Sequence, residues 1–309
     1  MIIDADAHFT PKLHGDHEWI LSYNQRKKNT FSDINLREEE LIMLGVDKQL
    51  LNPMGKSLEL FYSMPVRYAG HIMRTYNEAM YDIVADSARF NFNLWLALQD
   101  IEACLAELDR YQDKKFFGVH VSEAPAYGFL SDMNFLWSIL NDRRIPWYMH
   151  LTVAEDSLPT KITVPPKYEH IQEFFKDDPW KFSIASLILN GIPERYPNIP
   201  FIIAERDIDW IKSFCWDMLR LSKIDPLPIF RKHFWFTIEP ENKNFLKDAD
   251  YIGFDRLLFA TDWPHDHDAG GKNSRQDTKT IVQLGINVDN LEAVCYKNYQ
   301  QLENRSGVV

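Results

Sequence analysis

Short apolar segments alternate with stretches of helical periodicity along almost the whole chain. Eight segments have the length and apolar content of buried strands, and sequence with apolar residues three and four positions apart separates them. This alternation is typical of parallel βαβ units rather than of hairpins. The count favours an α/β fold, a single (β/α)8 barrel spanning residues 1–309. Its expected strands are residues 2–8, 46–52, 93–99, 116–122, 146–151, 200–205, 233–239 and 256–261.

Helices are expected between these strands and after the last one. Asn35 is a candidate N-cap of the first helix and Asp207 of a later one, because short polar side chains suit that position. The expected helices are residues 36–44, 66–88, 101–111, 131–142, 180–190, 208–221, 241–249, 277–284 and 290–302. Two polar segments, 9–33 and 152–178, interrupt the alternation, and we expect them to be loops over the C-terminal face of the barrel.

Polar residues stand at the ends of four expected strands. The first strand contains Asp4-Ala5-Asp6-Ala7-His8, and a strand period of two places its three polar side chains on one side. Taken alone, this segment fits an exposed strand with a solvated face as well as a binding site. Barrels of this type, however, carry catalytic groups at strand ends, and His150, Glu205 and Asp262 end three further strands. The convergence predicts a metal site that includes Asp6 and His8, with Asp4 as a structural residue deeper in the strand.

Charge and composition restrict the partners. The formal net charge is −11 and the sequence pI is about 5.4, which argues against a nucleic acid or an anionic membrane because phosphate would be repelled. Hydrophobic residues make up 45% and aromatic residues 14%, enough for a large core with a pocket for a small-molecule substrate.

Cysteine usage and the N-terminus bear on location. Cys104, Cys215 and Cys295 are far apart and form no CxxC pair, so we expect neither disulfides nor a thiolate zinc site. The N-terminus lacks a signal-peptide pattern, and no stretch approaches the ~18 apolar residues of a membrane span. We therefore expect a soluble, cytoplasmic protein.

Three motifs carry a resemblance to a known family. They are residues 255–265 (DRLLFATDWPH), residues 194–198 (ERYPN) and residues 148–150 (YMH). Together they resemble the amidohydrolase superfamily, and within it the amidohydrolase-related (amidohydrolase 2) family around aminocarboxymuconate semialdehyde decarboxylase. The resemblance covers nearly the whole chain.

The resemblance implies a divalent metal, one ion or two, held by Asp6, His8, His150 and Asp262. In the resembling family the first strand most often carries His-x-His, so Asp6 stands where a histidine is usual. Glu205 looks to occupy a sixth-strand position that usually holds a histidine. Because carboxylates are harder ligands than imidazoles, this donor set suits Mn²⁺ or Fe²⁺ as well as Zn²⁺.

Three polar residues near this set have alternative roles. Glu205 could act as a general base, bridge a second metal, or form an ion pair with Arg206 or a barrel neighbour. His120 could join a second metal site or pack inside the barrel. His265 could orient Asp262, contact substrate, or organise its own loop, and we assign it to the catalytic set as a residue that supports a metal ligand.

The resemblance supports two reactions. Metal-dependent hydrolysis of an amide, lactone, ester or thioester ranks first, because decarboxylases of this branch generally keep the sixth-strand histidine. In it, metal-activated water attacks a carbonyl while Asp262 or Glu205 moves the proton. Non-oxidative decarboxylation of an aromatic or unsaturated carboxylic acid, with Asp262 as proton donor, is the alternative. A barrel that has lost its metal and only binds a ligand is the third possibility. A homodimer is the expected assembly, since dimers are common in the resembling branch.

Overall fold

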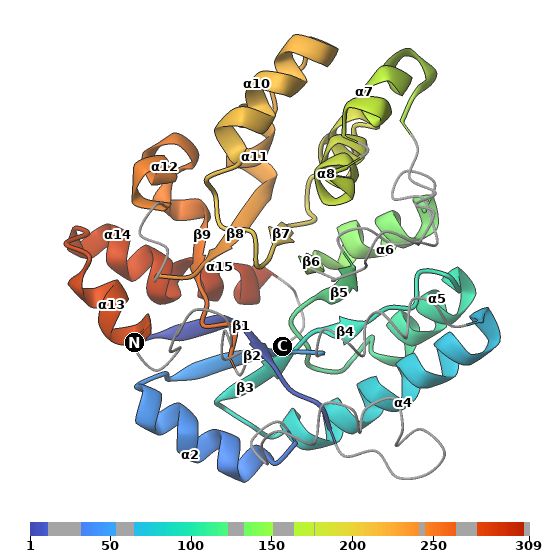
Figure 1. Cartoon of the computed structure of the whole chain (residues 1–309). Helices are drawn as coiled ribbons and strands as arrows, with labels where there is room; N and C mark the ends of the chain where they lie inside the picture. The colour runs from blue at the N-terminus through green and yellow to red at the C-terminus, as the bar shows by residue number, and fades with distance from the viewer. Residues whose placement is uncertain are drawn as a thin grey trace.

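The computed structural model describes residues 1–11, 32–53, 65–122, 133–150, 164–175, 177–240, 245–263 and 277–305. Strands lie at the centre and helices surround them (Figure 1). All strand pairings are parallel. The strands are β1 (Ile3–His8), β2 (Lys48–Asn52), β3 (Phe90–Phe92), β4 (Leu94–Trp95), β5 (Val119–Ser122), β6 (Trp147–His150), β7 (Phe201–Ile203), β8 (Phe234–Ile238) and β9 (Leu257–Phe259).

The pairings define a three-stranded sheet, β1-β2-β3, and a six-stranded sheet, β4 to β9, and backbone contacts between their ends arrange the strands in a ring with eight positions. β3 and β4 are consecutive pieces of one strand, since β3 pairs with β2 and β4 pairs with β5. The two ends of the ring meet just beyond β9, where the Asp262 amide donates to the Asp6 carbonyl (3.0 Å) and the His8 amide donates to the Trp263 carbonyl (2.6 Å). Ala7 and Trp263 form a parallel bridge at the same place. The predicted (β/α)8 barrel is confirmed.

The third strand differs from its prediction. It covers residues 90–95 rather than 93–99, and it is interrupted at Asn93. Leu96, Ala97 and Leu98 are buried, which made them resemble a strand, but only the Leu96 amide of the three bonds to β5, at the His120 carbonyl. An apolar run therefore indicated burial correctly and strand pairing incorrectly.

Helices flank the strands in the predicted order, with shifted ends. Asp33, not Asn35, caps the first helix, because its carboxylate accepts from the amides of Asn35 and Leu36. Asp207 does not cap the helix that follows β7, which begins at Ile211. The longer helices are α2 (Ile34–Leu44), α4 (Val66–Val84), α5 (Ile101–Arg110), α6 (Asn134–Arg143), α8 (Pro179–Leu189), α10 (Ile211–Ser222), α12 (Phe245–Ile252) and α15 (Asn298–Arg305).

Shorter helices complete the outer layer. They are α7 (Glu169–Phe174), α9 (Ile192–Arg195), α11 (Leu227–His233), α13 (Asp277–Gln283) and α14 (Val288–Glu292), with a π-helical turn at Ala293–Lys297. The second predicted loop, 152–178, is helical in part, since it contains the 3₁₀ turn Pro166–Tyr168 and α7. Most of the first predicted loop and residues 151–163 lie outside the described residues.

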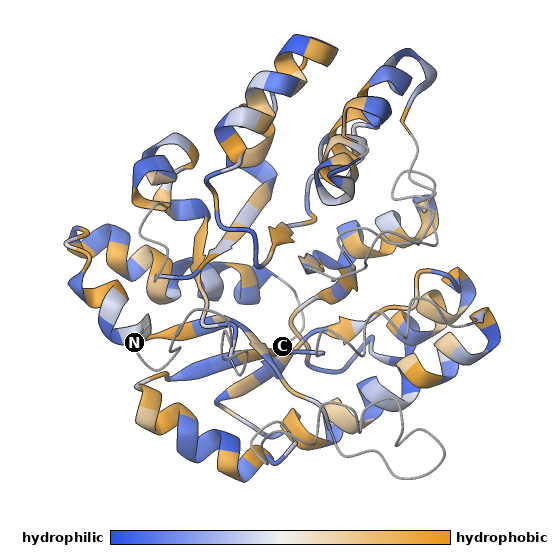
Figure 2. Cartoon of the chain, in the orientation of Figure 1, coloured by the Kyte–Doolittle hydropathy of each residue, from blue (hydrophilic) through white to orange (hydrophobic). Residues whose placement is uncertain are grey.

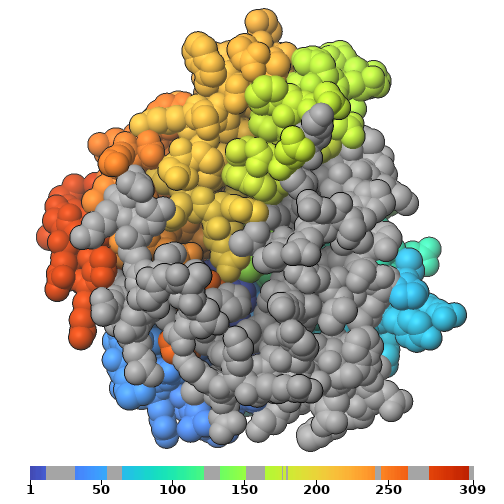
Figure 3. Space-filling view, viewed as in Figure 1, coloured from blue at the N-terminus to red at the C-terminus, as the bar shows by residue number. Residues whose placement is uncertain are grey.

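Helices of the outer layer between β6 and β8 pack against one another through aromatic side chains. Trp180 of α8 contacts Trp210 edge to face (ring centroids 4.8 Å apart), and Phe175 packs on Phe214 of α10 (5.5 Å). Figure 3 shows the yellow-green atoms of α7 and α8 against the gold atoms of α10 and α11 on this face. No helix of the described residues combines the length and apolar character needed to cross a bilayer.

Side chains fill the lower part of the barrel. An inner cluster contains Ala5, Leu50 and Ile202 from the strands together with Tyr299 and Leu302 from α15. The Tyr299 ring stacks on Phe117, with centroids 4.7 Å apart. Figure 2 shows orange apolar residues interspersed with blue polar ones along the helices that surround the strands. Because α15 closes the N-terminal end, the C-terminal ends of the strands remain as the place for a site.

The side chain of Asn77 on α4 hydrogen-bonds to the backbone of Trp95 in β4, just after the interruption at Asn93. Its side-chain oxygen accepts from the Trp95 amide (2.8 Å), and its NH₂ group donates to the Trp95 carbonyl (3.0 Å) and to Glu107 Oε1 (2.9 Å).

We expect Asn77→Ala to lower the free energy of unfolding by about 2 to 3 kcal/mol, because buried backbone groups lose their partners. Urea denaturation measures this change. The exposed Asn304→Ala on α15 serves as control and should stay within about 0.5 kcal/mol of the parent; equal losses would contradict the assigned role.

Candidate metal centre

A bulge in β1 sets the direction of its polar side chains. Asp4 pairs with Gln49 and Ala7 pairs with Leu51, so three steps along β1 match two along β2. Before the bulge, Ile3 and Ala5 face the inner cluster and Asp4 faces outward. After it, Asp6 reaches Asn52, which shares the inward face with Leu50. The prediction that Asp4, Asp6 and His8 share one side is therefore wrong for Asp4, because an inserted residue reverses the strand's alternation.

Asp4 instead joins the first strand to the last. Its fully buried carboxylate accepts from Gln49 Nε2 (2.7 Å), Thr261 Oγ1 (2.6 Å) and the Thr261 amide (3.0 Å). Burial raises the pKa of Asp4 to about 6. Arg37 of α2, also fully buried, extends the network by donating to Gln49 Oε1 (2.8 Å) and the Trp263 carbonyl (3.1 Å). These contacts hold the chain on both sides of Asp262.

Two acidic residues at strand ends have left-handed backbone conformations. Glu205, just after β7, has φ 56°, and Asp262, just after β9, has φ 53°. Such angles are uncommon for residues other than glycine and occur often at functional sites. The Glu205 amide donates to Thr237 Oγ1 (3.1 Å), and the Asp262 amide is held by the Asp6 carbonyl. Neighbouring strands thus hold both residues in their turned conformation.

The carboxylates of Glu205 and Asp262 lie close to two histidine side chains. His8 Nε2 lies 3.0 Å from Asp262 Oδ1 and 3.6 Å from Glu205 Oε1. His150 Nε2 lies 3.6 Å from the same Glu205 oxygen and 3.5 Å from Asp6 Oδ2. The two imidazole rings stand at 89°, with centroids 4.8 Å apart. The structure therefore brings together all five predicted ligands, from β1, β6 and the chain after β7 and β9.

The tautomer of His8 bears on what this cluster can bind. His8 Nδ1 lies 2.8 Å from the Pro53 carbonyl, and only a protonated nitrogen can donate to a carbonyl. In the neutral ring, Nε2 then presents a lone pair to the carboxylates of Asp262 and Glu205. Two acceptors that face each other in a buried place are compensated either by a second proton on the imidazole, which then donates to Asp262, or by a metal ion between them. An imidazole fixed through its other nitrogen is a common metal ligand.

Burial supports the same interpretation. The side chains of His8, His150 and Asp6 are 0 to 1% exposed, Asp262 is 5% exposed and Glu205 10%. Asp6 Oδ2 is buried and has no hydrogen-bond partner among the described residues. Buried carboxylates are costly unless a cation or donors compensate them. Ligand atoms of Asp6, His8 and His150 lie within 4.8 Å of one another, as do those of His8, Glu205 and Asp262, so the residues fit one or two metal ions.

Two further histidines that the sequence analysis considered have different outcomes. His120 faces Tyr148 across the β5–β6 pairing, two residues before His150 along the register, and its ring centroid lies 5.1 Å from that of His150. It belongs to neither ligand group. Burial, and then His150, lower the pKa of His120 well below its usual value, so its imidazole is neutral. His265 lies outside the described residues.

Sequence reasoning missed two asparagines behind the ligands. Asn52 Nδ2 donates to Asp6 Oδ1 (2.7 Å), and Asn93 Nδ2 donates to Asn52 Oδ1 (2.7 Å). Both are buried, and they form a chain that fixes the orientation of the Asp6 carboxylate. The available signal was their position, because Asn52 ends an apolar strand and Asn93 stands at the edge of another.

Comparisons with known proteins agree with the fold. A family model described as amidohydrolase matches residues 3–298. A 2,6-dihydroxybenzoate decarboxylase from Rhizobium has 19% sequence identity and a TM-score of 0.73, covering 98% of this chain and 98% of that one. A 5-carboxyvanillate decarboxylase from Novosphingobium aromaticivorans, complexed with manganese and 4-hydroxy-3-methoxy-5-nitrobenzoic acid, has 15% identity and a TM-score of 0.74, covering 98% and 96%.

A protein from Staphylococcus aureus described as a candidate amidohydrolase is similar to the same extent, with 18% identity, a TM-score of 0.73, and 98% and 99% coverage. The comparison with curated proteins gave no match.

Removing the support behind Asp6 should weaken metal binding. We expect Asn52→Ala to raise the Kd for Mn²⁺ by about 10- to 100-fold, because residues that orient a ligand usually contribute that much. Titration of Mn²⁺ followed by electron paramagnetic resonance measures the free ion directly. Asn91→Ala is the control, since Asn91 is also a buried strand residue but contacts Glu303 rather than a ligand. Unchanged affinity in Asn52→Ala, or no Mn²⁺ binding by the parent, would contradict the assignment.

Proposed function

Because this chain belongs to the amidohydrolase family, matched over residues 3–298, we propose that it is a metal-dependent decarboxylase of aromatic carboxylic acids. The sequence ranked hydrolysis first. The similar solved structures instead include decarboxylases of dihydroxybenzoate and carboxyvanillate, which supports the decarboxylase alternative better than hydrolysis. The proposed substrate is an aromatic acid with a hydroxyl group next to the carboxylate.

The enclosure of the site carries this proposal. Every one of the five clustered side chains is at most 10% exposed, so the reacting group would sit in a place with little bulk water. Protonation of a ring carbon followed by loss of CO₂ suits such a site, since it needs a proton donor and no attacking water. Exclusion of water also strengthens each electrostatic interaction with the substrate.

We assign Asp6, His8, His150 and Glu205 to the metal, with Asp262 completing the set and carrying the proton. The ion, when bound, would act as a Lewis acid toward the carboxylate and the adjacent phenolic oxygen of the substrate. We favour Mn²⁺, with Fe²⁺ and Zn²⁺ as alternatives, because three of the five donors are carboxylates and a similar structure holds manganese.

The proton transfer can be written with this chain's own groups. Asp262, protonated when substrate is bound, gives its proton to the ring carbon that bears the carboxylate. The bond from that carbon to the carboxylate then breaks, its electron pair returns to the ring, and CO₂ leaves. Asp262 regains a proton from water after product release. No oxidant or reductant is needed. The left-handed turn and the Asp4–Thr261 hydrogen bonds keep the Asp262 carboxylate directed at the site.

Hydrolysis stays as a second candidate because of one contact. Glu205 Oε1 lies 3.6 Å from both His8 Nε2 and His150 Nε2, where a carboxylate could accept a proton from an attacking water. The metal-free binding protein is the weakest alternative, since all five ligand-type residues are together. A cytoplasmic location and a homodimer remain predictions; the three buried, unpaired cysteines fit a reducing compartment.

A substrate panel separates the two reactions. We expect the Mn²⁺-loaded protein to release CO₂ from hydroxybenzoates such as 2,6-dihydroxybenzoate or 5-carboxyvanillate. In D₂O the product should carry one deuteron at the carbon that lost the carboxylate, which mass spectrometry detects. The same protein should show no acid release from esters, thioesters or lactones. The reverse pattern would favour hydrolysis, and no turnover in either panel would favour the binding protein.

Asp262 can be tested separately. We expect Asp262→Asn to reduce kcat by at least about a hundredfold, because an amide cannot supply the proton, while circular dichroism and the Tm stay close to the parent. The exposed Asp142→Asn on α6 is the matched control and should keep full activity. Parent-like turnover in Asp262→Asn would remove Asp262 from the mechanism.

A further inference from the structure

A cavity lies at the end of the barrel opposite the metal centre. Its volume is about 410 Å³, and it opens where β7 and β8 begin, far along the strands from the metal centre. Residues from four separate parts of the chain line it, including the chain before β7, the end of α11 and the end of α15. A cavity of this size is in the range that holds a small metabolite.

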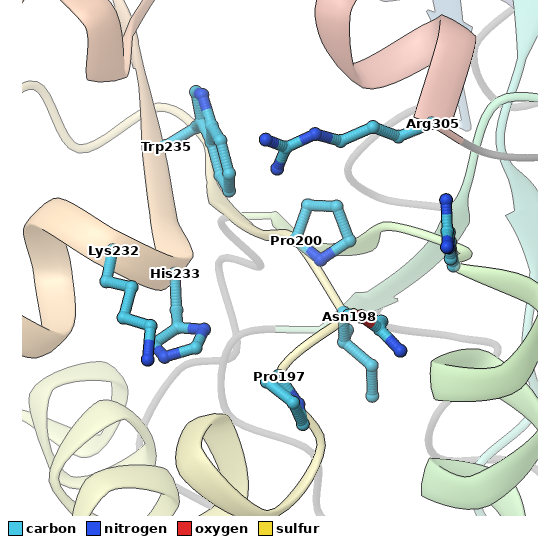
Figure 4. Close-up of a pocket in the computed structure, with 9 residues that line it drawn as sticks. Pro197, Asn198, Pro200, Lys232, His233, Trp235 and Arg305 are labelled. Atoms are coloured by element: carbon cyan, nitrogen blue, oxygen red, sulfur yellow. The ribbon is translucent and has the colours of Figure 1, made fainter.

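The charged residues of this cavity are all basic. Arg144, Lys232 and Arg305 line it together with His233, and no aspartate or glutamate does. Among the described residues, the three cations form no ion pair or hydrogen bond. Figure 4 shows Arg305 reaching in from one side, with Lys232 and His233 together on the other and Pro200 between them. Unpaired cations that converge in a hollow of a protein with net charge −11 form a local attraction for anions.

A fourth cation lies just behind the wall. The ring of Trp235, a lining residue, has the Arg256 guanidinium 4.6 Å from its centroid and the Arg305 guanidinium 5.9 Å from it. Burial lowers the pKa of Arg256, and the proximity of Arg305 lowers it further, against the effect of Asp255. The guanidinium groups of Arg256 and Arg305 therefore repel each other. An anion in the cavity would relieve this repulsion.

His233 adds a feature that surface cations lack. It is 3% exposed, and its Nε2 is buried without a hydrogen-bond partner among the described residues. Its ring bonds to the backbone of Pro197, so Nδ1 is the donor. Burial, Lys232 and Arg256 lower the pKa of His233 to about 4, and the ring is neutral. Nε2 is thus an acceptor beside three cations, and it fits a ligand that combines negative charge with a hydroxyl group.

We propose that this cavity binds the phosphate group of a small phosphorylated molecule. Two guanidinium groups and one ammonium group suit the oxygens of a phosphate, which arginine can contact through two parallel hydrogen bonds. The protonated oxygen of a hydrogen phosphate, or a neighbouring hydroxyl of the ligand, donates to His233 Nε2. A sulfate ion has the charge but lacks the hydroxyl. The site is separate from the metal centre and does not depend on the reaction proposed for it.

Calorimetric titration of the metal-loaded, full-length protein with inorganic phosphate, and then with glucose 6-phosphate, tests the proposal. We expect saturable binding that Lys232→Gln and Arg305→Gln each weaken about tenfold, as for the loss of one charge-assisted hydrogen bond. Arg305→Lys, which keeps the charge, should lose less. Arg220→Gln on α10 is the matched control, since it removes one exposed cation distant from the cavity, and it should leave binding unchanged. Binding at the metal centre would persist in the cavity variants and so be recognised.

Three results would overturn the proposal. The first is no saturable phosphate binding by the parent up to about 10 mM. The second is equal weakening by Arg220→Gln and the cavity variants, which would mean diffuse surface attraction. The third is sulfate binding as tightly as phosphate in the parent, because His233 would then have no part in recognition. His233→Phe should reduce the preference for phosphate over sulfate while leaving the Tm close to that of the parent.

Discussion

The seam between the first strand and the chain after the last strand is the contact on which the rest of the structure depends. The backbone of Asp6 and His8 bonds there to that of Asp262 and Trp263, and the Asp4 carboxylate adds two hydrogen bonds from Thr261 across the same seam. These residues are about 250 positions apart in sequence. Closing the barrel and assembling the proposed metal ligands are consequently one event, because the same backbone segments perform both.

The electrostatics of the centre follow from that closure. Strand ends bring three carboxylates and two imidazoles into a place with little exposure, and the hydrogen bond from His8 to Pro53 leaves an imidazole lone pair facing carboxylate oxygens. An arrangement of this kind costs stability without a cation. The asparagines behind Asp6 and the network around Asp4 hold the ligands in position. The N-terminal end of the barrel has the opposite charge, since the basic side chains of the cavity lie there around the neutral His233. The proposed cation site and the proposed anion site thus lie at opposite ends of one barrel.

Much of this architecture could be predicted from local patterns. The alternation of apolar and helical segments correctly indicated eight parallel strand positions, and the ligand-type residues at four strand ends came together as expected. The predictions of strand and helix ends were wrong where residues are buried but do not pair in a strand, or where a neighbouring residue caps the helix. Leu96 to Leu98 are apolar and buried but lie beyond the third strand, and Asp33 rather than Asn35 caps α2. The part of residues 152–178 that forms α7 was predicted as a loop, because its proline and charge content obscured a short helix.

The sequence by itself determined the barrel and the chemical types at its strand ends, because strand period and parallel βαβ order are local properties that direct polar strand ends to one face. Only the tertiary structure decided which of those residues face one another. The β1 bulge that turns Asp4 away from Asp6 and His8 depends on register with β2, and the left-handed turns at Glu205 and Asp262 depend on hydrogen bonds from neighbouring strands. The support of Asp6 by Asn52 and the basic cavity around His233 likewise join residues that are distant in sequence. Contacts of this kind arise from the closure of the ring, which no local pattern encodes.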